Sequence, residues 1–194
     1  MKLRKVSMKQ EMKNTALLVM DVQPTIVDRL ENKDEYVEKV SVAVDAAHKN
    51  QIPVIYVVVG FRSGFPEVSA RNKTFSTIKE RVSTVMIDPR PVIELADNDV
   101  VVVKRRVSAF SGSDLEVLLR AWDIEHLVLT GIATSGVVLS TTREAADKDY
   151  QLTILSDLCA DFDAEVHAVL LAKVFPRQAT VTTSEEWINT MNKE

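Results

Sequence analysis

The chain has 194 residues, 46% of them hydrophobic and 27% charged, and a formal net charge of −4 at pH 7. This length suffices for one α/β domain and is short for two, and the negative charge argues against a general nucleic-acid surface. No stretch approaches the roughly 20 apolar residues of a membrane span, and one cysteine excludes an intrachain disulfide. Residues 1–13 contain no hydrophobic block typical of a signal peptide. We therefore expect a single domain over residues 1–194 with a flexible segment at 1–13, a cytoplasmic location, and neither nucleic acid nor membrane as a partner.

Three apolar runs in the first half of the chain predict buried strands, at residues 15–21, 52–59 and 99–104. The first run ends on Asp21 and the third on Lys104. Between the first two runs, apolar residues recur at helical spacing over residues 33–50. After the third run, the composition of residues 114–122 predicts a helix.

The second half of the chain continues this alternation. Residues 127–129 form a short apolar run, Gly131 breaks the pattern, and the spacing becomes helical from Gly136 onward. Further strands are predicted at 150–156 and 179–182, and helices at 163–175 and after Thr183. Two pairs of residues fit capping boxes, Ser113 with Glu116 and Thr183 with Glu186.

Alternating strands and helices predict an α/β fold, a three-layer doubly wound sandwich with a mainly parallel six-stranded sheet. Such sheets bind ligands at the carboxyl edge, where a helix start also offers free N–H groups to an anion. Asp21, Lys104 and the turn near Val137 all fall at this edge, so we expect an active site there. For either charged residue alone, the ordinary explanation is that it is simply the first polar residue after a strand.

Residues 60–98 lack clear periodicity, and a segment of this length inside a compact domain is usually functional, often a lid. Phe61 and Arg62 in this segment could contact a planar or anionic ligand, and we include them among the candidate binding residues. The alternative is that the aromatic side chains only anchor the segment to the body of the protein.

The segment GIATSGVVLSTTREA resembles the nucleophile segment of the isochorismatase-like hydrolases, also called the cysteine hydrolase family. The glycine, two threonines and alanine of that family's motif are matched by Gly131, Thr134, Thr141 and Ala145. Val137 stands where the family has its cysteine. TALLVMDVQ resembles the family's first strand with its catalytic Asp, and VVVKRRVSAFSGSDLEVLLRA resembles the segment with its catalytic Lys. The resemblance extends from about residue 15 to 187 and implies the family's fold.

The resemblance further implies that Asp21 and Lys104 are the catalytic pair, and that Ile132, Ala133 and Val137 shape an anion-binding turn with a cis Ile132–Ala133 peptide. In cysteine-bearing members the Asp takes the thiol proton and the thiolate attacks an amide or nitrile-like carbon. Val137 has neither a proton to give nor a lone pair, so this route is excluded here. Members without the cysteine hydrolyse a vinyl ether, which requires an acid and a water. Those members have glycine at this position, which leaves more space than valine.

Other candidates for chemistry are weaker. Cys159 is expected to be a buried structural thiol, and neither Ser135 nor Ser140 has a histidine in its motif to activate it. His48, His126 and His167 lie on elements other than the family's metal-binding segment, so we assign no metal. The five glycines form no phosphate-binding loop, and no cofactor is expected. Arg105 and Arg106 are expected to form ion pairs or a subunit contact.

Two functions remain open. The first is a hydrolase of a small, carboxylated or cyclic molecule that uses Asp21 and Lys104 without a cysteine nucleophile. The second is a catalytically silent member of the family that acts as a small-molecule-binding or scaffold protein. Val137 favours the second, and the retention of both charged residues favours the first. The resemblance also implies a homodimer or homotetramer.

Overall fold

The computed structural model describes residues 14–81 and 89–192. Its strands form one six-stranded sheet in the order β3-β2-β1-β4-β5-β6, and every pair of neighbouring strands is parallel. The strands are β1 Thr15–Met20, β2 Val54–Val59, β3 Val100–Lys104, β4 His126–Ile132, β5 Gln151–Ala160 and β6 Thr180–Thr182. This arrangement confirms the predicted fold class. The strand order reverses between β1 and β4, the point at which doubly wound sheets open a crevice at their carboxyl edge.

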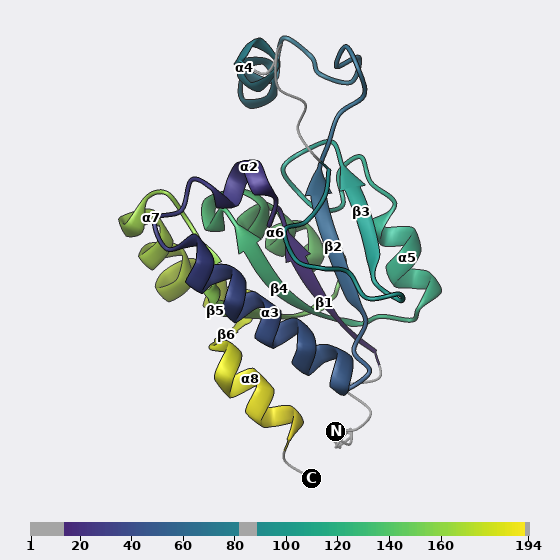
Figure 1. The fold of residues 1–194 in the computed structure, drawn as a ribbon, viewed down its shortest axis with the longest axis vertical. Helices are drawn as coiled ribbons and strands as arrows, with labels where there is room; N and C mark the ends of the chain where they lie inside the picture. Colours follow the sequence, from purple (N-terminus) through teal and green to yellow (C-terminus); the bar gives the residue numbers. More distant parts are fainter. Residues whose placement is uncertain (1–13, 82–88, 193–194) are drawn as a thin grey trace.

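Helices cover both faces of the sheet (Figure 1). One face packs against α3 and α8, and the other against α5 and α6. These helices are α3 Lys33–Lys49, α5 Leu115–Ala121, α6 Leu139–Asp147 and α8 Ser184–Met191. Successive residues of β1 point to opposite sides, Leu17 into the α3 cluster and Leu18 into the α5 cluster, and both are fully buried. Burial on both faces explains why the strands are continuous apolar runs instead of alternating ones.

A lobe formed by residues 60–81 follows β2 and projects beyond the carboxyl edge of the sheet (Figure 1). It contains α4 Lys73–Arg81, a helix that the sequence did not predict. The base of the lobe is tied to the loop after β3 by Glu67. The Glu67 carboxylate lies 3.1 Å from Arg105 Nε, and the Glu67 carbonyl accepts a hydrogen bond of 2.8 Å from Arg106. The expected ion-pair role of Arg105 is thus confirmed.

Several local predictions were wrong. β5 continues beyond Asp157 to Ala160, because a bulge shifts its pairing with β4. The helix expected over 163–175 is divided into α7 Ala164–Val169, a π-helical turn Leu170–Val174 and a 3-10 turn Phe175–Arg177. Ser113 makes no capping box; its hydroxyl donates to the Ala109 carbonyl at 2.6 Å and α5 begins after Asp114. The capping box of Thr183 and Glu186 at α8 is confirmed.

Some expectations are not decided by the structure. The flexible segment at 1–13 lies outside the described residues, and so does part of the 60–98 segment, at 82–88. A single domain over 1–194 stays a prediction. Within the described part of the chain, no helix has the length and apolarity to cross a membrane.

Gly131 on β4 offers a test of how tightly the central strands pack. Its φ is +143°, and a Cβ atom added there would lie 2.2 Å from the Met20 carbonyl oxygen of β1. We expect Gly131→Ala to lower the free energy of unfolding by on the order of 3 kcal/mol, because both the backbone and the neighbouring strand would have to move. Gly64→Ala is the matched control. The φ of Gly64 is +78°, but no atom of the described residues lies within 4 Å of an added Cβ. We therefore expect the free energy of unfolding to fall by only about 1 kcal/mol. Equal losses in urea unfolding would contradict this account.

Candidate active site

Asp21 and Lys104 meet at the carboxyl edge of the sheet. Asp21 directly follows β1 and Lys104 is the last residue of β3, so the lysine side chain spans the end of β2, which lies between them. Lys104 Nζ lies 2.9 Å from Asp21 Oδ2 and donates a further hydrogen bond of 3.0 Å to the Arg106 carbonyl. The side chains are only 2% and 10% exposed, respectively. The sequence therefore predicted correctly that these two strand ends converge; their catalytic role stays a prediction.

The backbone and the surroundings of Asp21 are both unusual. Its φ is 57°, in the left-handed region that few residues other than glycine adopt, while its amide still donates to the Val57 carbonyl at 2.7 Å. Asp21 Oδ1 is buried and has no hydrogen-bond partner among the described residues. Burial raises the pKa of Asp21 to about 6, against the opposing effect of the Lys104 ammonium. Protonated and ionised forms of this carboxyl group therefore coexist close to neutral pH.

The turn after β4 lies beside this pair in the strand order, because β4 neighbours β1. The Ile132–Ala133 peptide is cis, as the resemblance implied. A π-helical turn, Thr134–Val138, then leads into α6. The sequence had predicted a regular helix from Gly136, but the φ and ψ of Gly136, −99° and −105°, are not helical.

Two side chains from the region after β5 hold this turn. His167 Nδ1 lies 2.8 Å from the hydroxyl of Thr134, which is fully buried, and Asp161 Oδ2 accepts a hydrogen bond of 2.6 Å from the Ser135 amide. From the sequence, His167 was considered only as a metal ligand and set aside. No spacing rule could have found this contact, because Thr134 and His167 are 33 residues apart and meet only through tertiary packing.

Gln23 is a second residue that the sequence analysis missed. Its side chain is fully buried and makes two hydrogen bonds to one residue: Oε1 accepts from the Val59 amide at 2.8 Å, and Nε2 donates to the Val59 carbonyl at 3.1 Å. The Gln23 side chain therefore bonds to the last residue of β2 as the backbone of a neighbouring strand would. The sequence offered one indication of this role: Gln23 is a polar residue two positions after Asp21, where the first predicted strand ends.

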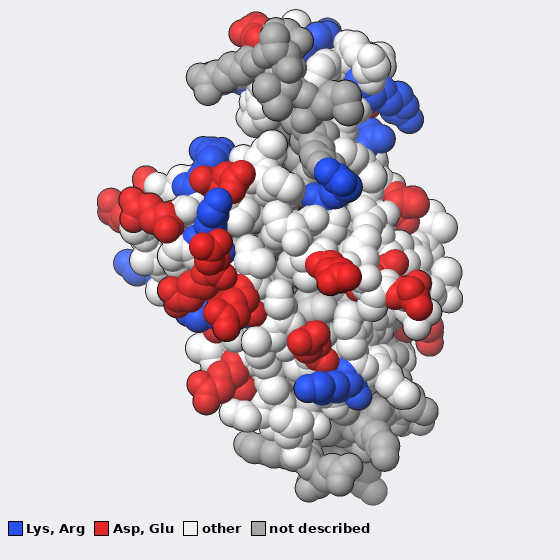
Figure 2. Space-filling model, in the orientation of Figure 1, with Lys and Arg blue, Asp and Glu red and all other residues white. Residues whose placement is uncertain are grey.

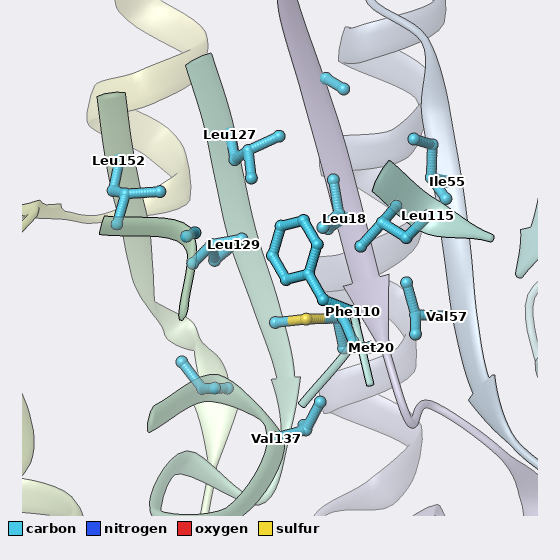
Figure 3. Close-up of a cluster of buried hydrophobic side chains, with 14 of the residues drawn as sticks. Leu18, Met20, Ile55, Val57, Phe110, Leu115, Leu127, Leu129, Val137 and Leu152 are labelled. Carbon is cyan, nitrogen blue, oxygen red and sulfur yellow. The ribbon is translucent and has the colours of Figure 1, made fainter. Parts of the chain in front are cut away.

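Val137, which the resemblance aligns with the family's cysteine, is 2% exposed. It belongs to the buried cluster that also contains Met20, Phe110 and Leu129. In Figure 3 it lies at the Met20 end of this cluster, far from Leu127 and Leu152. The Val137 side chain thus packs with the core, and the lack of a nucleophile at this position stays a prediction.

The two candidate binding residues of the lobe make contacts within the lobe. The Phe61 ring lies 5.6 Å from that of Phe65 and 5.4 Å from that of Phe75, centroid to centroid. Arg62 is exposed and its guanidinium lies 3.3 Å from the Glu67 carboxylate. These contacts hold the lobe together internally and do not reach the body of the protein, so anchoring to the body and ligand binding by Phe61 and Arg62 both stay predictions.

Cys159 is buried in β5, and burial raises the pKa of its thiol to about 12. A thiolate is therefore disfavoured, which agrees with a structural role. Across residues 14–81 and 89–192, no group of three or more His, Cys, Asp and Glu side chains is placed to hold a metal ion.

Comparison with known proteins gives the family. The Isochorismatase domain matches residues 15–186. An uncharacterized isochorismatase family protein of Bacillus subtilis is 31% identical, over 92% of this chain and 94% of that protein. A protein of Arabidopsis thaliana named probable inactive nicotinamidase is 27% identical, over 93% and 97% of the two chains. The solved structure of an isochorismatase family protein from Burkholderia thailandensis superimposes with a TM-score of 0.79 at 27% identity, covering 93% of this chain and 97% of that one. The chain therefore belongs to the isochorismatase family.

Proposed function

We propose that this protein hydrolyses a small, carboxylated or cyclic molecule, with Asp21 as the general acid/base, Lys104 as its electrostatic partner and no cysteine nucleophile. Members of the family are hydrolases, although one similar protein is named probable inactive nicotinamidase. The observation that carries the proposal is the buried contact of 2.9 Å between Lys104 and Asp21, in which the second carboxylate oxygen is left without a partner among the described residues. Removing two charges from water is costly, so their burial at a ligand-binding edge favours a chemical use.

The absence of a sulfur at position 137 restricts the reaction to one without a covalent intermediate. Val137 offers no lone pair, and Cys159 lies within β5 with a thiol that stays protonated at neutral pH. Water must then be the nucleophile, and the protein must supply a proton donor or acceptor and an electrostatic environment.

The asymmetry of Asp21 suits it to act as an acid. Lys104 occupies Oδ2, so in the neutral form the transferable proton resides on Oδ1, the oxygen left without a partner. For a vinyl ether, this proton bonds to the enol carbon, and the electron pair of the double bond forms the new C–H bond. The oxygen of a water then bonds to the resulting oxocarbenium carbon, and its proton returns to Asp21. The hemiketal that forms releases the alcohol and leaves a ketone, while Lys104 stabilises the transient carboxylate.

The remaining candidates shape this site in our proposal. Ile132, Ala133 and Val137 line the anion-binding turn, which His167 and Asp161 hold in place through their hydrogen bonds to Thr134 and Ser135. Phe61 and Arg62 bind the substrate from the lobe. The proposed partners are a small-molecule substrate and further copies of the chain in a homodimer or homotetramer.

A catalytically silent binding or scaffold protein is the second candidate. The packing of Val137 into the core favours it, and so does the similarity to a relative named as inactive. The enzyme is favoured because a silent domain has no chemical need for the buried pair of Asp21 and Lys104.

The first test is a hydrolase screen over vinyl ethers, esters and amides, with the wild type and Asp21→Asn. Asparagine tolerates a left-handed backbone, so we expect the variant to fold and to lose about 10²–10⁴-fold in kcat/KM. If Asp21 acts as the acid, kcat/KM of the wild type falls as the pH rises through about 6, because the protonated form then disappears. A rise over the same range would instead indicate a base.

Asp123→Asn is the matched control for this screen. Asp123 also has a left-handed backbone, with φ 54°, but it is exposed and lies before β4 at a distance from the site in sequence and fold. We expect wild-type rates for it. If the wild type turns over no compound and Asp21→Asn binds ligands equally well, the silent function replaces our proposal.

The second test restores the sulfur with Val137→Cys. The side chains are close in size, so the loss of stability should stay below about 1.5 kcal/mol. We expect amidase activity to appear and to disappear again when Asp21→Asn is added, because the carboxylate must accept the thiol proton. Val138→Cys, a change at a fully buried neighbouring position, should produce none. If Val137→Cys gains no amidase activity, the remaining residues of the pocket are not arranged for catalysis by a cysteine.

A further inference from the structure

Lys104 begins a run of three consecutive basic residues, Lys104-Arg105-Arg106, of which the proposed reaction uses only the first. All three are at least partly buried, and cations so close to one another need compensating partners. The partner of Lys104 is Asp21. The two arginines turn instead toward the lobe, where Figure 2 shows mostly basic side chains. The acidic partner that Arg105 finds there is Glu67.

The two arginines join the loop after β3 to the first residues of the lobe. Arg105 Nε lies 3.1 Å from the Glu67 carboxylate, and the same guanidinium donates to the Gly60 carbonyl at 2.9 Å. Arg106 donates to the Glu67 carbonyl at 2.8 Å and to the Arg105 carbonyl at 2.6 Å. The side chains of Glu67 and Arg105 are only 14% and 22% exposed, so water and salt screen their ion pair weakly. The backbone at Arg105 and Arg106 is therefore held from the lobe.

The same stretch of backbone holds the ammonium of Lys104. Nζ donates to the Arg106 carbonyl at 3.0 Å and lies 2.9 Å from Asp21 Oδ2, and these are its two acceptors among the described residues. A lysine has a flexible stem of four carbons, so the position of its charge depends on the groups that accept from it. On the body side, the Arg105 amide donates to the Ser111 carbonyl at 3.3 Å, a long bond compared with those from the lobe.

We propose that the two arginines after β3 and their lobe partner Glu67 are positioning residues for Lys104. They hold the Arg106 carbonyl where it fixes the ammonium of Lys104 against Asp21. Because Glu67 belongs to the lobe, a displacement of the lobe changes the contact between Lys104 and Asp21. The catalytic consequence rests on the proposed function, whereas the positioning itself can be measured on Asp21 without a substrate.

Asp21 reports on the position of Lys104. Burial raises the pKa of Asp21 to about 6, and the nearby ammonium opposes this rise. Lys104 is the charged side chain in contact with Asp21 among the described residues. When the Arg106 carbonyl is released, the ammonium is held less closely and the pKa of Asp21 rises further. The carboxylate that forms after proton transfer then loses stabilisation, so the rate of proton transfer falls.

The first measurement is the pKa of Asp21, followed by carbon-13 NMR of carboxyl-labelled aspartate and assigned with Asp21→Asn. We expect Glu67→Leu to raise this pKa by at least about 0.5, because an opposite charge nearby normally lowers the pKa of a carboxyl group by about 1–3. The sign is decisive. Loss of the negative charge of Glu67 would by itself lower the pKa of Asp21, so a rise indicates a change at Lys104.

Substitutions of Arg106 test the other half of the contact. Arg106→Met removes the guanidinium and keeps a long side chain, and we expect the same rise in the pKa of Asp21. Arg106→Lys keeps the charge but not the fork that joins two carbonyls, so it should recover only part of the wild-type value. Arg120→Met is the matched control. Arg120 Nε lies 3.1 Å from Glu116 on α5 and its side chain is 75% exposed, so we expect an unchanged pKa of Asp21.

Kinetics with a substrate from the hydrolase screen gives the second measurement. A positioning role predicts that Glu67→Leu and Arg106→Met lower kcat by about 10-fold while KM changes by less than about 3-fold. The pH at which kcat/KM falls should move upward together with the pKa of Asp21. A purely structural loss would reduce the active fraction without moving that pH.

An unchanged or lowered pKa of Asp21 in folded Glu67→Leu overturns the proposal, whatever the activity. A rise of equal size in Arg120→Met overturns it too, as does complete recovery in Arg106→Lys, which would reduce the role of Arg106 to its charge. If circular dichroism shows that Glu67→Leu does not fold, Glu67→Gln takes its place under the same criterion. A wild type that hydrolyses nothing refutes the proposed function, but a raised pKa in the Glu67 and Arg106 variants would still establish that the lobe positions Lys104.

Discussion

The buried contact between Asp21 and Lys104 is the constraint on which the carboxyl edge of this protein depends. The two residues end strands that are not neighbours in the sheet, so their contact requires β1, β2 and β3 to stop at the same level. Gln23 fixes the end of β2 with two hydrogen bonds, and the Arg106 carbonyl holds the ammonium from the other side. A buried pair is costly unless its geometry is held in this way. The same burial raises the pKa of Asp21 into a useful range.

The second feature of the candidate site is the apolar side chain of Val137. Val137 belongs to the buried cluster of Met20 and Phe110, so its side chain contributes to the packing of the core. The turn that carries it is nonetheless held by specific polar contacts to Asp161 and His167. A turn kept rigid next to a carboxyl group of intermediate pKa agrees with acid–base chemistry on a bound water. It does not require a covalent step.

Two segments near the carboxyl edge of the sheet, the lobe and α7, pack only partly against the rest of the protein. The lobe is tied to the body mainly by Glu67 and its arginine partners, and α7 buries none of its own residues. Both lie at the end of the molecule that carries the candidate site, whereas α8 lies toward the other end (Figure 1).

The sequence by itself determined the order of strands and helices, the parallel sheet and the convergence of Asp21 and Lys104, because local apolar spacing and right-handed crossovers leave few alternatives. The family resemblance added the cis peptide at Ile132–Ala133. Only the tertiary structure decided the contact of Thr134 with His167, the length of β5 and the exposure of α7. Contacts between distant residues leave no periodic trace in one sequence. An apolar spacing, moreover, is the same whether the residues are covered or not, so the sequence could not show that Val166 and Val169 on α7 are partly exposed.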